Sequence, residues 1–106
     1  MMTTQIYYVN KAGDLFKIND LEILQYEVDI NVVEINLRCT NGHSYKIERI
    51  VCSNDDDCRK VGEQFIAYIY SSIERIYNVE KENKQIEILT SLDFLNIKGV
   101  TDLIGY

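Results

Sequence analysis

Apolar and polar residues alternate along the first half of the chain, which is the pattern of β-strands that bury one face. The segments 5–9 (QIYYV) and 15–18 (LFKI) are separated by the polar stretch NKAGD. Gly13, within that stretch, can adopt a positive φ without steric cost. The pattern therefore predicts a β-hairpin at the start of the chain.

The alternation changes phase further along. Apolar residues first occupy even positions and then odd ones: Leu24, Tyr26, Val28, Ile30 and Val32, followed by Val33, Ile35, Leu37 and Cys39. One strand register cannot bury both sets, because neighbouring side chains point to opposite faces of a sheet. We therefore expect a β-bulge or a tight turn within residues 29–31.

The sequence Thr-Asn-Gly at 40–42 marks the next turn, because Asn-Gly is a strong hairpin signal. A two-residue Asn-Gly loop would pair apolar residues with polar ones. A three-residue loop with a left-handed glycine instead places Leu37 opposite Tyr45 and Ile35 opposite Ile47. We expect this second register because it keeps the core face continuous.

Residues 54–79 have helical periodicity. Six of them recur at three- and four-residue steps and define one face: Cys58, Val61, Phe65, Ile69, Ser72 and Ile76. The remaining expected segments are a strand at 44–52 disturbed near 49–50, a polar connector at 81–85, a strand at 86–89 and a short helix at 93–97. The predicted fold is α+β in a single domain over 1–106: an antiparallel sheet of about five strands in hairpins, one long helix packed on it and a short C-terminal segment.

The net charge of the chain excludes some classes of binding partner. The chain has 17 acidic and 11 basic residues and a formal net charge of −6. Binding to nucleic acid and to anionic membrane surfaces depends on basic side chains, so neither is expected. A protein partner with a basic surface is favoured instead. No apolar run approaches the ~18 residues of a membrane span, and the N-terminus lacks secretory-signal character, so we expect a cytoplasmic protein.

The stretch VCSNDDDCRK at 51–60 is the densest group of reactive side chains. Ser53 or Asn54 can cap the following helix, and aspartates in its first turn oppose the positive end of the helix dipole. A calcium loop of EF-hand type fails, because Ile66 occupies the position where such a loop needs glutamate. We therefore interpret the stretch as a helix start.

The sequence also argues against zinc and against catalysis. Cys52 and Cys58 are spaced too widely for a typical zinc pair, and His43, the only histidine, lies at the predicted hairpin turn. The five glycines are scattered, so they form no phosphate-binding loop. We expect no catalytic residues, no metal and no cofactor, and interpret the cysteines as small core residues, with a 52–58 disulfide as the alternative.

Acidic residues supply the first candidate surface. On the strand that begins at Leu24, the outward positions are Gln25, Glu27 and Asp29, and neighbouring outward side chains lie about 6–7 Å apart. The candidate partner-binding acids are Glu22, Glu27, Asp29, Glu34, Asp55, Asp56 and Asp57. The alternative interpretation is a solvated sheet face whose charges prevent aggregation.

The predicted helix supplies the second candidate surface. Its core face is flanked by a stripe of Ile66, Tyr70, Ile73 and Tyr77. Tyrosine is common at interfaces because it combines a large contact area with a polar tip. Tyr70 and Tyr77 are therefore candidate partner-binding residues, and the stripe is a possible homodimer interface. Alternatively, the segment SLDFLNI (91–97) covers the stripe.

The block EINLRCTNGHSYKIERIVCSNDDDCRKVGEQFIAYI resembles the central part of small, acidic, phage-encoded anti-CRISPR inhibitors of Cas9. The corresponding segments are the turn at 40–42, the Tyr-x-Ile strand at 45–47, the acidic link at 53–57 and the helical run at 65–67. The match covers about a third of the chain, which departs from the pattern in its strand-rich N-terminal half and its three cysteines. The resemblance implies occlusion of a basic nucleic-acid site by an acidic surface.

The leading hypothesis is a non-enzymatic acidic binding protein, an inhibitor from a phage or mobile element that mimics nucleic acid. Two alternatives are a small structural or homo-oligomeric domain and an immunity protein that neutralises a nuclease toxin.

Overall fold

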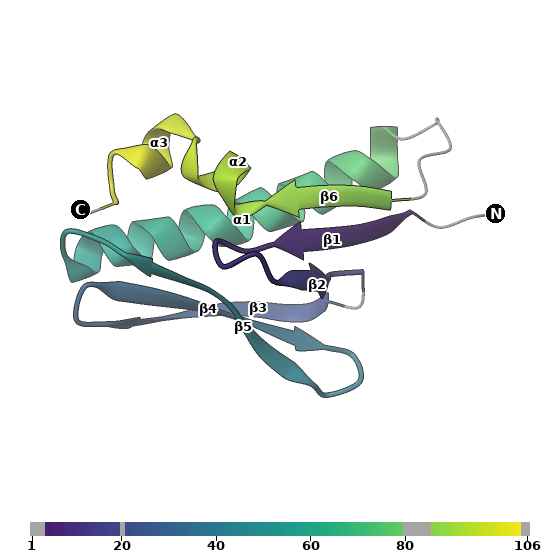
Figure 1. The fold of residues 1–106 in the computed structure, drawn as a ribbon, viewed down its shortest axis with the longest axis horizontal. Coiled ribbons are helices and arrows are strands. Elements are labelled where there is room, and N and C mark those ends of the chain that lie inside the picture. The colour runs from purple at the N-terminus through teal and green to yellow at the C-terminus, as the bar shows by residue number, and fades with distance from the viewer. Residues whose placement is uncertain (1–3, 20, 80–85, 105–106) are drawn as a thin grey trace.

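The computed structural model describes residues 4–19, 21–79 and 86–104, which form six strands and three helices (Figure 1). In chain order the elements are β1 (Gln5–Val9), β2 (Leu15–Lys17), β3 (Leu21–Asp29), β4 (Val32–Cys39), β5 (Ser44–Val51), α1 (Asp55–Val79), β6 (Ile86–Thr90), α2 (Ser91–Leu95) and α3 (Lys98–Thr101). The predicted α+β class and the long helix are confirmed, whereas the expected connector at 81–85 lies outside the described residues.

The strands form two sheets of three strands each. Sheet A has the order β2-β1-β6, and sheet B has the order β3-β4-β5. Every pairing is antiparallel except that of β1 with β6, which is parallel. Parallel neighbours need a long crossover connection, and the chain between these two strands includes sheet B and α1. The sequence pattern predicted the hairpins but did not indicate that the last strand returns beside the first.

The phase change in the apolar pattern is caused by a two-residue turn. Ile30 and Asn31 have φ values of 41° and 62° and connect β3 to β4. Two consecutive residues with positive φ are characteristic of the tight turns that fit the twist of a hairpin. The predicted tight turn is therefore confirmed, and Ile30 lies at its tip, 80% exposed.

The β4–β5 hairpin confirms one predicted pairing and corrects the other. Gly42 has a φ of 88° in the three-residue loop, and Leu37 lies opposite Tyr45 as expected. The pairing of Ile35 with Ile47 was wrong, because Ile35 lies opposite Glu48. The register shifts at this point, so the strand disturbance occurs two residues earlier than predicted. As a result both Ile47 and Glu48 are buried.

The core lies between α1 and the inner faces of the two sheets. Helix α1 packs against β3 and β4, and the six residues of its predicted core face are all buried. The ring of Phe65 on α1 meets Tyr8 of β1 edge-on, with centroids 5.3 Å apart. On its other side Phe65 meets Phe94 of α2, at 4.9 Å. Phe65 therefore connects sheet A to the C-terminal segment. The first short helix of that segment spans 91–95, whereas the sequence predicted 93–97.

Gly62 allows α1 to approach sheet B closely. A Cβ atom at this position would lie 2.5 Å from ring atoms of Tyr26 on β3. Such a separation is far below van der Waals contact, so the Tyr26 ring packs directly on the helix backbone. Glycine is required at position 62 because any side chain there would overlap the Tyr26 ring.

We expect Gly62→Ala to lower the free energy of unfolding by about 1–3 kcal/mol, because the added methyl group must displace the Tyr26 ring or the helix. Urea denaturation followed by circular dichroism measures this change. Gly99→Ala is the matched control, since an added Cβ atom there meets no heavy atom within 4 Å. Equal stability of the two variants would contradict the assigned contact.

Candidate functional site

The acidic stretch at 55–57 begins helix α1, as predicted. The Oδ1 atom of Asn54 accepts a hydrogen bond of 2.8 Å from the backbone N–H of Asp57, which is the geometry of an N-cap. Asn54, rather than Ser53, is therefore the capping residue. The three aspartates occupy the first turn, where negative charge is stabilised by the helix dipole.

A hydrogen bond joins this helix start to the β3–β4 turn. The backbone N–H of Asn31 donates to Oδ1 of Asp55 over 2.7 Å, and the carbonyl of Asn31 accepts from the N–H of Cys52 over 2.8 Å. Asp29 ends β3 immediately before this turn. The two contacts therefore bring the acids of β3 and those of α1 to the same end of the molecule (Figure 1).

We call this surface the acidic end and define it as Glu27, Asp29, Asp55, Asp56 and Asp57. Four of these residues are exposed and Asp57 is half-buried. Among the described residues, Asp56 is the only one of the five in an ion pair, with Arg59 at 2.7 Å. The acidic end is therefore a concentrated negative surface of incompletely paired charge.

Two further acids that the sequence predicts to bind a partner also form ion pairs. Glu22 lies 3.7 Å from Arg38, and Glu34 lies 2.7 Å from Lys46. Glu34 shares the outer face of sheet B with Glu27 on one side and Arg49 on the other. Basic residues on β4 and β5 thus neutralise part of the face on which β3 carries its acids.

The sequence interpretation missed these basic residues. The alternation that placed Glu34 outward also places Arg38 outward, so that ion pair had a sequence signal. The alternation gave no such signal for Arg49, because Arg49 faces outward only as a consequence of the register shift in β5.

The Tyr/Ile stripe on α1 is partly covered. Tyr70 and Tyr77 are 44% and 50% exposed, whereas Ile66 and Ile73 pack against the core. The hydroxyl of Tyr77 accepts a hydrogen bond of 3.0 Å from Nδ2 of Asn19. The C-terminal segment does not provide the expected cover for the tyrosines, because its Phe94 packs on Phe65 and Tyr68.

A cleft of about 330 Å³ lies between the β1–β2 turn and the edge strand β5. Its lining residues are Asn10, Lys11, Ala12, Lys46, Ile47, Glu48 and Arg49. Three of these side chains are basic, which sets the cleft apart from the acidic end. Glu48 is itself only 5% exposed.

Glu48 is held by a polar contact that the sequence did not indicate. Its Oε2 atom accepts a hydrogen bond of 2.5 Å from the hydroxyl of Tyr8, and its Oε1 atom accepts from the backbone N–H of Lys11 over 3.2 Å. Burial, together with the hydrogen bond and the charge of Glu48, raises the pKa of Tyr8 above its ordinary range. The phenol therefore remains a neutral donor to the carboxylate.

All three cysteines are buried, and none is part of a disulfide. Burial, and then the neighbouring Cys58 thiol, raise the pKa of Cys52 to about 12. A protonated thiol is a poor nucleophile and a poor metal ligand. Among the described residues, no three His, Cys, Asp or Glu side chains are placed to hold a metal ion.

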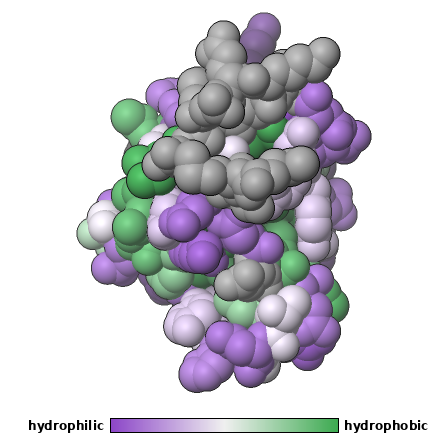
Figure 2. Space-filling model, turned by 90° about the vertical axis from the view of Figure 1, so that its right-hand side faces the viewer, coloured by the Kyte–Doolittle hydropathy of each residue, from purple (hydrophilic) through white to green (hydrophobic). Residues whose placement is uncertain are grey.

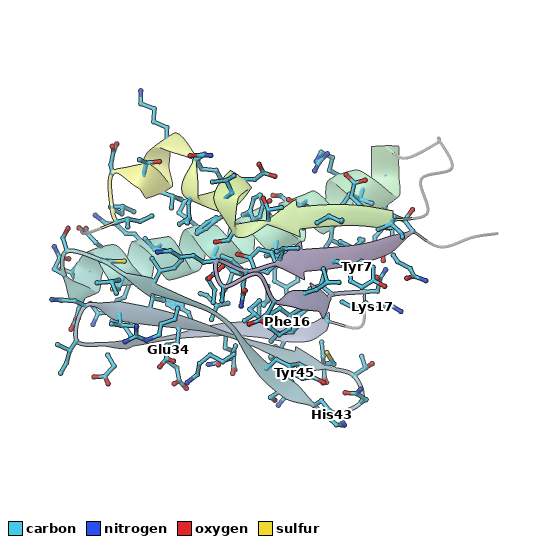
Figure 3. All side chains as sticks on the ribbon, viewed as in Figure 1. Tyr7, Phe16, Lys17, Glu34, His43 and Tyr45 are labelled. Carbon is cyan, nitrogen blue, oxygen red and sulfur yellow. The ribbon has the colours of Figure 1, made fainter. Side chains whose placement is uncertain are left out.

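His43 lies exposed beside the β4–β5 loop, where its ring stacks on Tyr45 with centroids 6.3 Å apart (Figure 3). This is the position that the sequence predicted for it, at the hairpin turn.

Comparison with known proteins finds no matching family model, no matching curated protein and no matching solved structure. None of the described helices has the length and apolar character to cross a membrane. The site is therefore interpreted from its own geometry.

We expect Tyr8→Phe to lower the free energy of unfolding by about 1.5–3 kcal/mol, the range for hydrogen bonds to charged groups. Tyr7→Phe is the matched control, because the Tyr7 hydroxyl donates to Gln5 on the exposed surface. Urea denaturation at neutral pH compares them. A loss for Tyr8→Phe no larger than that for Tyr7→Phe would contradict a structural role for the buried hydrogen bond.

The free energy of unfolding should also depend on pH differently in the wild type and in Tyr8→Phe. Tyr8 keeps its proton in the folded protein and loses it in the unfolded chain above its ordinary pKa of 10.0, so its contribution to stability is present below that pH and is lost above it. We therefore expect the stability of the wild type to fall more steeply above pH 10 than that of Tyr8→Phe. Urea midpoints across the alkaline range measure the slope.

We expect none of the three thiols to react rapidly with Ellman's reagent in the native protein, because all three are buried. Addition of denaturant should release three reactive thiols, which serves as the internal control. Fewer than three would reveal a disulfide, and fast reaction without denaturant would contradict the burial of Cys39, Cys52 and Cys58.

Proposed function

We propose that this protein is a non-enzymatic binding protein that presents the acidic end to a basic surface of a nucleic-acid-handling protein, as an inhibitor would. The observation that carries the proposal is the hydrogen bond from the N–H of Asn31 to Asp55. It joins two acidic segments that are distant in the sequence into one surface. Lys/Arg clefts that hold phosphates attract such a surface, because carboxylates supply the same sign of charge.

The geometry of the acidic end suits recognition. Glu27 and Asp29 are alternate residues of one strand, so their side chains share a face at a spacing of about 6–7 Å. The Asp55 carboxylate is held by the N–H of Asn31, and the Asp57 carboxylate accepts a hydrogen bond of 3.4 Å from Nδ2 of Asn54. Little conformational entropy is lost when charges held in this way meet a partner, which favours affinity.

The distribution of charge also favours this end over the rest of the outer face of sheet B. On sheet B, Glu22 and Glu34 are paired with bases of the same chain, which reduces their attraction for an external cation. Glu27, Asp29, Asp55 and Asp57 have no ion pair among the described residues. We therefore place the centre of the interface on the acidic end, with Glu22 and Glu34 outside it.

We expect Glu27→Lys/Asp29→Lys to weaken partner binding by about 10-fold or more, because opposed like charges at an interface cost several kcal/mol. The measurement compares binding of the immobilised proteins to a panel of purified basic nucleic-acid-binding proteins, with the Cas9–guide complex and a nuclease toxin as separate members. Added salt should weaken a genuine complex, because it screens the attraction.

Glu63→Lys/Glu74→Lys is the matched control. Both residues are exposed on α1, and each reversal adds two charges, so both double variants change the net charge from −6 to −2. Binding that survives in the control and is lost in the acidic-end variant supports the proposal. Equal loss in both would indicate a general charge effect, and undiminished binding in the acidic-end variant would remove this surface from the interface.

A further inference from the structure

The outer face of sheet A is the second surface with an unusual composition. Its side chains alternate with the buried residues Ile6, Tyr8 and Leu89, which face the core. The outward set has eight members: Gln5, Tyr7, Val9, Leu15, Lys17, Ile86, Ile88 and Thr90. Five are apolar or aromatic, and none is a carboxylate.

The apolar members of this face are substantially exposed. Leu15, Ile86 and Ile88 are 59%, 58% and 53% exposed. Tyr7 and Val9 lie between them on the central strand and are half-buried. Figure 2 shows hydrophobic atoms gathered on its left side, which is the side of the molecule that faces the viewer in Figure 1, where β1 and β6 lie. The exposed residues thus form one patch rather than isolated positions.

Sheet A combines a parallel pair, β1 with β6, and an antiparallel pair, β1 with β2. Sheets made only of parallel strands are almost always covered on both faces. The inner face of sheet A is covered by the core, but none of the described elements packs on the outer face over β1 and β6. Among the described residues, the parallel pair is therefore covered on one face only.

The charge of the face indicates what can cover it. The whole chain carries −6, yet the outer face of sheet A carries a single charged residue, Lys17. Two copies of an acidic chain repel each other wherever carboxylates would meet. The outer face of sheet A has no carboxylate, so two copies that meet there bring no acidic side chains together. It is therefore the described sheet face best suited to contact between copies.

We propose that two copies of this chain associate through the outer faces of sheet A, packed face to face about a two-fold axis parallel to β1. This axis lays β2 of one copy over β6 of the other, because these strands flank β1 on opposite sides. Lys17 then covers the partner's Ile88 with its aliphatic stem while its ammonium group remains at the rim, and the two lysines lie on opposite sides of the interface. The arrangement is an aligned sandwich of two sheets.

The expected affinity follows from the size of the face. Exposed apolar patches on monomers reach about 300–600 Å², so two such faces together bury about 1,000 Å², the lower bound of specific interfaces. The dimer should therefore dissociate in the micromolar range. None of the eight residues belongs to the acidic end, so the proposal stands independently of the proposed function.

Sedimentation velocity over a concentration series that spans the micromolar range tests the proposal. The weight-average mass of the wild type should rise from 12.4 kDa toward twice that value. Ile88→Lys should raise the dissociation constant by at least about 10-fold, because it places a positive charge in the apolar interface opposite the partner's Lys17. Added salt should leave the dimer intact or strengthen it, since it screens only the repulsion between acidic copies.

Ile30→Lys is the matched control, because it makes the same substitution at an 80% exposed isoleucine on the β3–β4 turn. Circular dichroism confirms that both variants are folded. A dimer lost in Ile88→Lys and kept in Ile30→Lys supports the proposal. A monomer at every concentration, equal effects of the two substitutions, or a dimer broken instead by Tyr70→Lys on α1 would each overturn it.

Discussion

The contact between Tyr8 and Glu48 holds the two sheets in their relative position. Tyr8 belongs to β1 of sheet A and Glu48 to β5 of sheet B, and the hydroxyl and the carboxylate meet at 2.5 Å in the interior. A buried carboxylate is costly unless hydrogen bonds replace its hydration, and the N–H of Lys11 supplies the second one. The ring of Tyr8 simultaneously packs on Phe65, so this polar contact and the aromatic core fix the same junction between sheets and helix. The positions of the other elements depend on this junction.

The register shift in β5 makes that contact possible and also determines the charge of the outer surface. With regular alternation, Lys46, Glu48 and Ile50 would all face outward from sheet B. The extra residue turns Glu48 inward and brings Arg49 outward in its place, opposite Glu34. One irregularity therefore replaces a negative side chain by a positive one on the outer face. The acids of sheet B are partly neutralised there, whereas Asp29, Asp55 and Asp57 at the acidic end have no ion pair among the described residues.

Features encoded by neighbouring residues could be predicted from the sequence, and features created by distant contacts could not. The hairpin turns, the Asn54 cap and the core face of α1 depend on local conformational preference and periodicity, and each was found. The disturbance of β5 was predicted two residues too late, because its position depends on the contact of Glu48 with Tyr8, forty residues away. The parallel pairing of β6 with β1 likewise depends on contacts between residues that are distant in the sequence. The acids of the site were each predicted from the sequence, but the hydrogen bond from the N–H of Asn31 to Asp55, which brings the two acidic segments to one end, could be seen only in the fold.

The acidic end and the outer face of sheet A are separate surfaces, and this separation affects how strongly a dimer could bind a basic partner. The acidic end and the outer face of sheet A share no residue, and they rely on opposite physical interactions, since salt weakens charge attraction and leaves apolar contact unchanged or strengthened. A dimer formed through sheet A would therefore keep both acidic ends available. Two such ends on one particle raise the effective concentration of the second after the first has bound, which increases avidity without any new contact, provided that the basic sites on the target match their separation. A small chain whose individual charge contacts are weak would gain most from this arrangement.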